Sequence, residues 1–161
     1  MRSAESLRAE GRILVLVAAS GSAALLAGAF AFEHLGGMHP CQLCLWQRWP
    51  HAAALVIAAL ALILGTRWLG WLGALAALTT AGIALFHTGV ERGWWEGLAG
   101  CSGGSLAGLD VNDLLNPNVV LAAPVRCDAV PWELLGLSMA SWNGIASLML
   151  ALLWVAAARR G

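Results

Sequence analysis

Charged residues are scarce in this sequence: they make up only 11% of its 161 residues, whereas 60% are hydrophobic. Lysine is absent, and nine arginines balance nine acidic residues, so the formal net charge is zero. This composition excludes a disordered chain and an ordinary water-soluble domain. The lack of a basic surface also excludes a nucleic-acid-binding role. We therefore predict a membrane protein.

Strand patterns and nucleotide-binding motifs are also missing. No stretch shows the alternation of apolar and polar residues that is typical of a strand, and no G-x-G-x-x-G follows one. The sequence therefore offers no site for a flavin or a dinucleotide. A redox cofactor would therefore have to bind without such a motif.

Four uncharged apolar stretches are long enough to cross a bilayer, which takes about 20 residues per helix. They cover residues 13–32, 49–66, 68–88 and 138–158. We predict an all-α membrane protein, a four-transmembrane-helix bundle that forms a single integral membrane domain over residues 1–161. Residues 33–48 form a short loop and residues 89–137 a long one, with a possible short amphipathic helix at Asp110 to Leu115.

Small residues recur at four-residue spacing in two of these stretches. The first stretch has Ser20, Ala24 and Gly28, and the third has Gly73, Ala77 and Ala81. Small side chains let helix backbones approach closely in a membrane, where apolar burial alone does not distinguish protein from lipid. Both rows are predicted to face other helices.

The arginines predict the orientation of the chain. Six of the nine lie in the two tails and in the connection between the second and third stretches: Arg2, Arg8, Arg12, Arg67, Arg159 and Arg160. The positive-inside rule places this side, with both termini, in the cytoplasm. Alternatively, the first stretch is a cleaved signal peptide ending near Ala29-Phe30-Ala31, although its length favours a retained helix.

All four cysteines lie in the two loops on the opposite side, away from the reducing cytosol. Cys41 and Cys44 form a Cys-x-x-Cys motif after Pro40, which is suited to the first position of a helix. Unpaired N–H groups in a first helical turn favour a thiolate, and Arg48 at i+4 from Cys44 is expected to favour the thiolate of Cys44. The alternative is an inert disulfide, with Arg48 reaching lipid headgroups.

The second pair, Cys101 and Cys127, brackets 25 residues of the long loop. Cys101 is flanked by glycines at 100, 103 and 104, and Cys127 by Arg126 and Asp128. A disulfide here could be a structural staple that contributes about 3 to 4 kcal/mol. However, thiol–disulfide exchange requires one sulfur to reach another, and a second cysteine pair lies on the same side. We therefore favour a relay of electrons between the two pairs, although four cysteines allow three pairings.

Such a relay needs an electron acceptor that dissolves in lipid, and a quinone fits this requirement. Its ring could lie near Cys44 and Arg48 while its tail lies among the helices. His87, near the end of the third stretch with Glu91 at i+4, could hydrogen-bond a quinone oxygen or could simply lie at the membrane interface. His34, His39 and His51 carry weaker signals.

The sequence resembles the disulfide bond formation protein B (DsbB) family of bacterial membrane enzymes. The resemblance rests on Pro40-Cys41-Gln42-Leu43-Cys44 with Gln47-Arg48, on the segment from His87 to Glu91, on Cys101 and Cys127, and on residues 131–139. It covers nearly the whole chain. It implies a multi-pass protein of the bacterial inner membrane with periplasmic cysteines.

The resemblance also implies an activity, that of a protein-disulfide:quinone oxidoreductase. A reduced periplasmic partner similar to DsbA attacks a Cys101–Cys127 disulfide through Cys101, and the released Cys127 attacks Cys41. Cys44 then faces a ubiquinone or menaquinone, with Arg48 and His87 as quinone-binding residues. The catalytic residues are thus Cys41, Cys44, Cys101 and Cys127, with no metal.

Three rival interpretations remain at this point. A membrane protein with two inert disulfides would reduce no quinone. A metal-binding protein with four thiolates is disfavoured because structural zinc sites usually pair two closely spaced cysteine units. A thiol enzyme of the vitamin K epoxide reductase type carries its membrane-proximal Cys-x-x-Cys on a late helix, whereas here the motif precedes the second apolar stretch.

Overall fold

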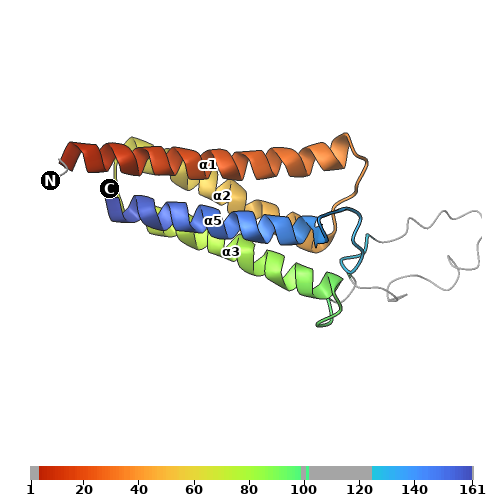
Figure 1. The fold of residues 1–161 in the computed structure, drawn as a ribbon. Helices are drawn as coiled ribbons and strands as arrows, with labels where there is room; N and C mark the ends of the chain where they lie inside the picture. Colours follow the sequence, from red (N-terminus) through yellow and green to blue (C-terminus); the bar gives the residue numbers. More distant parts are fainter. Residues whose placement is uncertain (1–3, 99–100, 102–124, 161) are drawn as a thin grey trace, which may run out of the picture.

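The computed structural model describes residues 4–98, 101 and 125–160, and four long helices dominate it. They are α1 (Ala4–His34), α2 (Gln42–Leu64), α3 (Leu69–Glu91) and α5 (Met139–Arg160). The helices run side by side in an up-and-down bundle with both ends of the chain at one end (Figure 1). All four are long and apolar enough to cross a membrane. This confirms the predicted four-helix membrane fold.

The second helix begins earlier than the apolar pattern indicates. The apolar pattern predicts a span from residue 49 and Pro40 predicts the helix start; α2 starts at Gln42, two residues after Pro40, and continues through Pro50 to Leu64. Cys44, Gln47 and Arg48 therefore lie within α2. Proline removes one backbone hydrogen bond from a helix interior. Close to this point, Thr80 of α3 donates its hydroxyl to the Gln47 carbonyl, 3.4 Å away, which ties the two helices together.

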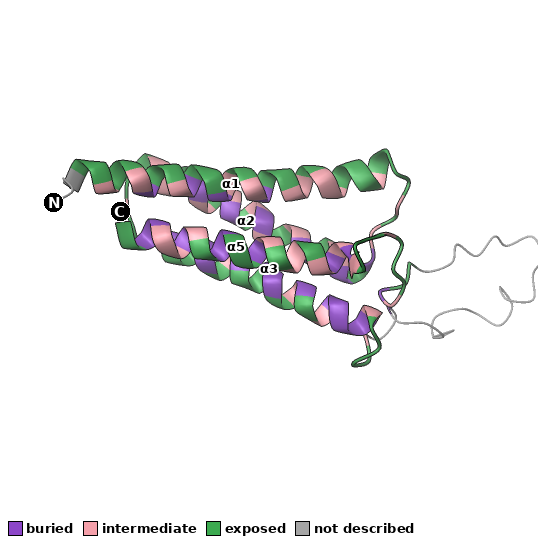
Figure 2. Ribbon diagram, in the orientation of Figure 1, coloured by how far each residue is buried: buried purple, intermediate pink, exposed green. Residues whose placement is uncertain are grey.

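Each helix packs against two others, with contacts between α1 and α2, α2 and α3, α3 and α5, and α5 and α1. Buried residues follow the inward faces, and α3 contributes the largest buried share and α1 the smallest (Figure 2). The predicted row Gly73, Ala77 and Ala81 is buried, as expected. The indole ring of Trp154 lies directly over Gly73, so close that a Cβ added to this glycine would overlap the ring.

The predicted row in the first helix is wrong. Ser20 and Ala24 are exposed, whereas Val15, Ala18 and Ser22 are buried. Small residues are frequent around the whole circumference of α1, so their spacing alone does not identify the inward face. The buried face is set by the partner helices, through contacts such as that between Gly21 and Leu150 of α5.

A short hairpin precedes α5, and the prediction that the chain has no strand is wrong there. Strands β1 (Glu133–Leu134) and β2 (Leu137–Ser138) pair antiparallel through a two-residue turn in which Leu135 and Gly136 both have positive φ, 55° and 74°. Two-residue strands are too short to show an alternating pattern. Ser138 then caps α5 by accepting the Ser141 N–H at 3.2 Å. The possible helix at Asp110 to Leu115 lies outside the described residues.

Candidate functional site

The Cys-x-x-Cys motif forms the N-terminus of α2, at the end of the bundle away from the chain termini. Cys41 is the N-cap residue, so Pro40 lies just before the cap and is not the first helical residue as predicted. The Cys41 sulfur accepts the backbone N–H of Cys44 at 3.3 Å, and the two sulfurs lie 2.9 Å apart. A side chain in this position satisfies one of the unpaired donors of the first turn. Both cysteines are free thiols in this structure.

Negative charge in this pair is stabilised on Cys41. The pKa of Cys41 falls from its ordinary 9.0 to about 4, chiefly because the Cys44 thiol hydrogen-bonds to the ionised sulfur. Burial opposes the shift, whereas His87 and the Cys44 N–H support it. The expected contact between Arg48 and Cys44 is not found, because the guanidinium donates to Glu33 of α1. The helix cap directs the donors to Cys41 instead.

Arg48 reaches toward α1 and not toward a sulfur. Its NH1 group donates to Oε2 of Glu33 at 2.5 Å, and its guanidinium carbon lies 4.9 Å from the centroid of the Phe30 ring. Its Nε is buried and has no hydrogen-bond partner within the described part of the chain. A buried unpaired donor is costly and is normally satisfied by a ligand or water. Arg48 therefore retains a donor for a bound molecule.

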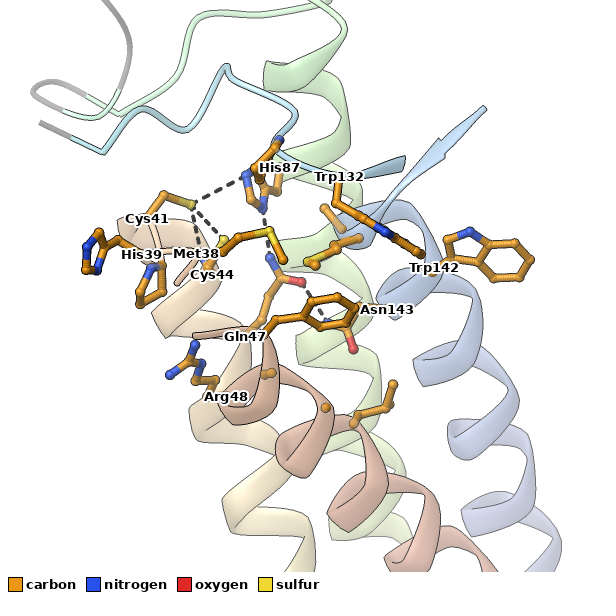
Figure 3. Close-up of a pocket in the computed structure, with 18 of the residues that line it drawn as sticks. Met38, His39, Cys41, Cys44, Gln47, Arg48, His87, Trp132, Trp142 and Asn143 are labelled. Atoms are coloured by element: carbon orange, nitrogen blue, oxygen red, sulfur yellow. Dashed lines mark hydrogen bonds between the residues drawn. The ribbon is translucent and has the colours of Figure 1, made fainter. Parts of the chain in front are cut away.

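His87 is buried beside the cysteine pair. Its side chain extends from α3, and its Nε2 atom lies 3.6 Å from the Cys41 sulfur (Figure 3). The carboxylate of Glu91, one turn further on, lies 3.8 Å from the same nitrogen and also accepts the Ser138 hydroxyl. The sequence therefore identified a residue of the site, but the neighbour that the structure gives to His87 is Cys41.

Below His87, a chain of polar side chains, buried except for the half-buried Asn143, crosses from α3 through α2 to α5. Gln47 contacts Nδ1 of His87 at 3.0 Å, and Asn143 donates to Gln47 at 2.7 Å (Figure 3). Asn143 also lies 3.0 Å from His51, which in turn lies 3.5 Å from Ser147. Sequence reasoning missed this chain. A polar residue in the middle of an apolar stretch, as with Asn143, is the signal that could have indicated it.

The other three histidines differ in their places. His34 is exposed at the end of the bundle, His39 is exposed but lines the cavity beside the cysteine pair, and His51 is buried in the polar chain. Of the three histidines with weak sequence signals, His51 is therefore the one that is buried in the bundle. Burial within an apolar helix distinguishes His51 from the others.

Cys101 and Cys127 form a disulfide, with Cα atoms 5.3 Å apart. Both are buried, at 6% and 0% exposure, and they pack in one cluster with Cys41, Leu43 and Val90. The backbone of Cys127 is also among the groups that interact with the His87 ring. The four cysteines lie at one end of the bundle, as the sequence predicts, and the structure adds that the two pairs pack against each other.

A cavity of about 390 Å³ opens beside the free thiols. Its walls include the apolar side chains of Leu25 and Phe32 from α1 and the rings of Trp132 and Trp142. Cys41, Cys44, Arg48, His51, His87 and Asn143 also line it. A largely apolar cavity with a few convergent polar groups is typical of a small-molecule site. Figure 3 shows the sulfurs, His87 and the tryptophans around it.

Three of these residues also resemble a metal site. The ligand atoms of Cys41, Cys44 and His87 all lie within 4.8 Å of one another. The four-thiolate site considered from the sequence is a different arrangement, because Cys101 and Cys127 are bonded to each other. A site with two thiolates and one imidazole would keep a fourth position open.

Comparison with known proteins places these features in a family. A family model described as disulfide bond formation protein DsbB matches residues 11–157. A protein named disulfide bond formation protein B from Acidovorax sp. (strain JS42) is 30% identical over 156 residues, or 93% of this chain and 88% of that protein. Proteins of the same name from Azoarcus sp. (strain BH72) and Methylococcus capsulatus are 31% and 36% identical, over 92% and 74% of this chain and 94% and 77% of their own lengths. No solved structure matches the chain.

Proposed function

Because the chain belongs to the DsbB family of disulfide-generating membrane oxidoreductases, we propose that it reoxidises a reduced DsbA-like thiol oxidase and passes two electrons to a membrane quinone. One observation carries this proposal. The free thiols of Cys41 and Cys44 lie at the wall of an apolar cavity that also presents Arg48 and His87. Thiols and a lipid-soluble oxidant can meet there.

In this proposal the chain is a single domain of the bacterial inner membrane, with its termini in the cytoplasm and its cysteines on the periplasmic side. The described chain ends lie at one end of the bundle and the cysteine pair at the other (Figure 1). Six of the nine arginines belong to the terminal end, in agreement with the positive-inside rule. The periplasm is also the compartment in which disulfides persist.

The loop disulfide receives the electrons in this scheme. The partner's thiolate attacks Cys101, which forms a mixed disulfide and releases Cys127 as a thiolate. Cys127 then attacks Cys41 of the oxidised Cys41–Cys44 pair, and Cys44 leaves as a thiolate. The partner's second thiolate displaces Cys101, and Cys101 attacks Cys127, which re-forms the loop disulfide while Cys41 leaves as a thiolate. Cys41 and Cys44 are then both reduced. The shared packing of Cys127 and Cys41 supports this order, because attack requires the two sulfurs to approach within bonding distance.

The cavity residues fit a quinone ring. Arg48 would donate from its unpaired Nε, and Phe32, Trp132 and Trp142 would pack on the ring. When bound, the quinone supplies a two-electron oxidant. On the protein side, the Cys41 thiolate and the Cys44 thiol become one disulfide, so the pair gives up two electrons and one proton, and the second proton of the quinol comes from water. Glu33 holds the Arg48 side chain at the cavity wall while this occurs.

The test is a steady-state assay with purified protein, a reduced DsbA-like partner and ubiquinone or menaquinone, in which quinol formation is followed by absorbance. The proposal predicts turnover by the wild type and none by Cys41→Ser or Cys44→Ser. A membrane protein with two inert disulfides predicts no quinol above the background rate. Turnover at the wild-type rate in the cysteine variants would refute the proposal.

A further inference from the structure

Gln47 lies at the centre of the buried polar chain and uses both ends of its amide. It is only 6% exposed. Its Nε2 lies 3.2 Å from the Leu43 carbonyl oxygen and 3.0 Å from Nδ1 of His87, and its Oε1 accepts from Nδ2 of Asn143 at 2.7 Å. All the contacts of this amide are made inside the protein, so its orientation is fixed by them and not by solvent.

The backbone carbonyl of Leu43 sets which group donates and which accepts in the hydrogen bonds that Gln47 and Asn143 make. The Leu43 oxygen can only accept, so the Gln47 atom facing it must be the NH₂ group. The other end of the amide is then an oxygen, which requires Asn143 to present its own NH₂ group. The Asn143 oxygen is left to accept from Nε2 of His51. Reversing the amide would bring two oxygens together at the Leu43 carbonyl.

The same direction determines the tautomer of His87. The second hydrogen of the Gln47 NH₂ group points at Nδ1, so this nitrogen must carry a lone pair and the ring proton must be on Nε2. Nε2 is the atom 3.6 Å from the Cys41 sulfur. We propose that Gln47, oriented by Leu43 and Asn143, is a positioning residue that keeps the His87 proton on Nε2, facing Cys41.

This arrangement has a function in the proposed reaction, on which this part of the inference rests. An N–H donor aimed at Cys41 favours its thiolate, the form in which Cys41 leaves when Cys101 attacks Cys127 and the loop disulfide re-forms. The other tautomer would present a bare lone pair to the sulfur. A doubly protonated ring would set its Nδ1 hydrogen against the hydrogens of Gln47. A proton on Nε2 and a lone pair on Nδ1 satisfy the contacts with Cys41 and Gln47, and the Glu91 carboxylate, 3.8 Å from Nε2, lies on the protonated side of the ring.

The arrangement also opposes metal binding at Cys41, Cys44 and His87. A metal would need the Nε2 lone pair, which moves the ring proton to Nδ1, and Gln47 cannot accept it there. In metal-binding histidines, the N–H group of the second ring nitrogen instead donates a hydrogen bond to a carboxylate, a carbonyl or water. The amide of Gln47 therefore protects the thiols from soft cations such as Zn²⁺, although the ligand atoms are close together.

The tautomer can be measured without any turnover. Reduced wild-type protein labelled with ¹⁵N-histidine is studied in detergent by two-bond ¹⁵N–¹H correlation at neutral pH, and His87→Gln assigns the His87 signals. We expect a protonated Nε2 and an unprotonated Nδ1. A protonated Nδ1, in either the neutral or the doubly protonated ring, would overturn the inference. Failure of the proposed quinone activity would leave this result unaffected.

Zinc affinity supplies a second test, in which a variant is expected to bind Zn²⁺ more tightly. In the background Cys101→Ser/Cys127→Ser, reduced protein competes with a chromophoric chelator for Zn²⁺. Gln47→Glu provides a carboxylate for an Nδ1 proton, so it is expected to bind Zn²⁺ about 10- to 100-fold more tightly than the unchanged Gln47 protein. Gln42→Glu makes the same charge change on the exposed first turn of α2 and controls for charge alone.

The outcomes of the zinc test are distinct. Tighter binding in Gln47→Glu but not in Gln42→Glu supports the inference. Equal affinity in all three proteins, or tight binding with the unchanged Gln47, contradicts it. If Gln47→Glu does not fold, Asn143→Leu tests the same arrangement by NMR, because loss of the Asn143 donor is expected to produce a mixture of His87 tautomers. A single unchanged tautomer in that variant would show that Asn143 does not orient Gln47.

Discussion

The guanidinium of Arg48 donates a hydrogen bond to the carboxylate of Glu33, 2.5 Å away, and joins α2 to α1 beside the cavity. This bond leaves the buried Nε without a partner among the described residues. Arg48→His would remove this donor and the planar guanidinium. We expect the KM for quinone to rise about tenfold, a loss of about 1.4 kcal/mol in binding, with a smaller change in kcat. Steady-state rates at varied quinone concentration measure both constants.

Glu33 should affect the KM for quinone less than Arg48 does. Glu33→Gln keeps a hydrogen-bond acceptor for Arg48 but removes the charge, so a smaller rise in the KM for quinone is expected. Arg67→His is the matched control for Arg48→His, since Arg67 is exposed in the connection between α2 and α3. An equal KM increase in Arg67→His would show that the effect does not arise at the cavity.

The charge on Cys41 predicts a characteristic pH dependence. Its pKa is lowered from 9.0 to about 4, so the thiolate is present above about pH 4 and is lost as the pH falls through that value. In reduced protein, alkylation of Cys41 should therefore continue in mildly acidic solution. Mass spectrometry after short reaction times at pH 3 to 9 locates the midpoint. A midpoint near that of an ordinary thiol, about 8.5, would contradict this account.

The close contact between Gly73 and Trp154 predicts an asymmetry between two glycines of α3. A Cβ at Gly73 would overlap the Trp154 ring, whereas a Cβ at Gly82 would meet nothing within 4 Å. We expect Gly73→Ala to reduce the free energy of unfolding by about 1 to 3 kcal/mol through overpacking. Gly82→Ala should be neutral or slightly stabilising, since alanine has the higher helix propensity. Thermal unfolding in detergent compares them, and equal stabilities would contradict the packing described.

The sequence was sufficient to predict the four helices, because long apolar runs are local signals. It was also sufficient for the buried row Gly73, Ala77 and Ala81 in α3. The apolar run of α2 was predicted to begin only at residue 49, because Gln42, Gln47 and Arg48 interrupt it, whereas the helix itself begins at Gln42, close to the start that Pro40 predicted. Helix formation there depends on the cap at Cys41 and on packing.

Contacts between distant segments could not be predicted. The sequence suggested Arg48 as the neighbour of Cys44 from helical spacing alone, but a carboxylate on α1 is a stronger partner for the guanidinium. In the same way, the bonds of Gln47 to His87 and Asn143 join residues 40 and 96 positions apart. Only the assembled bundle brings such groups together. The inward face of α1 was missed for the same reason.

A single-turnover experiment tests the central claim, that Cys41 and Cys44 deliver electrons directly to a quinone. Cys101→Ser/Cys127→Ser protein is reduced, freed of reductant and mixed under anaerobic conditions with one equivalent of quinone. We predict one quinol and one Cys41–Cys44 disulfide per protein, formed without any thiol partner. Quinone that remains oxidised while both thiols stay free, in protein shown to be folded, would contradict the claim.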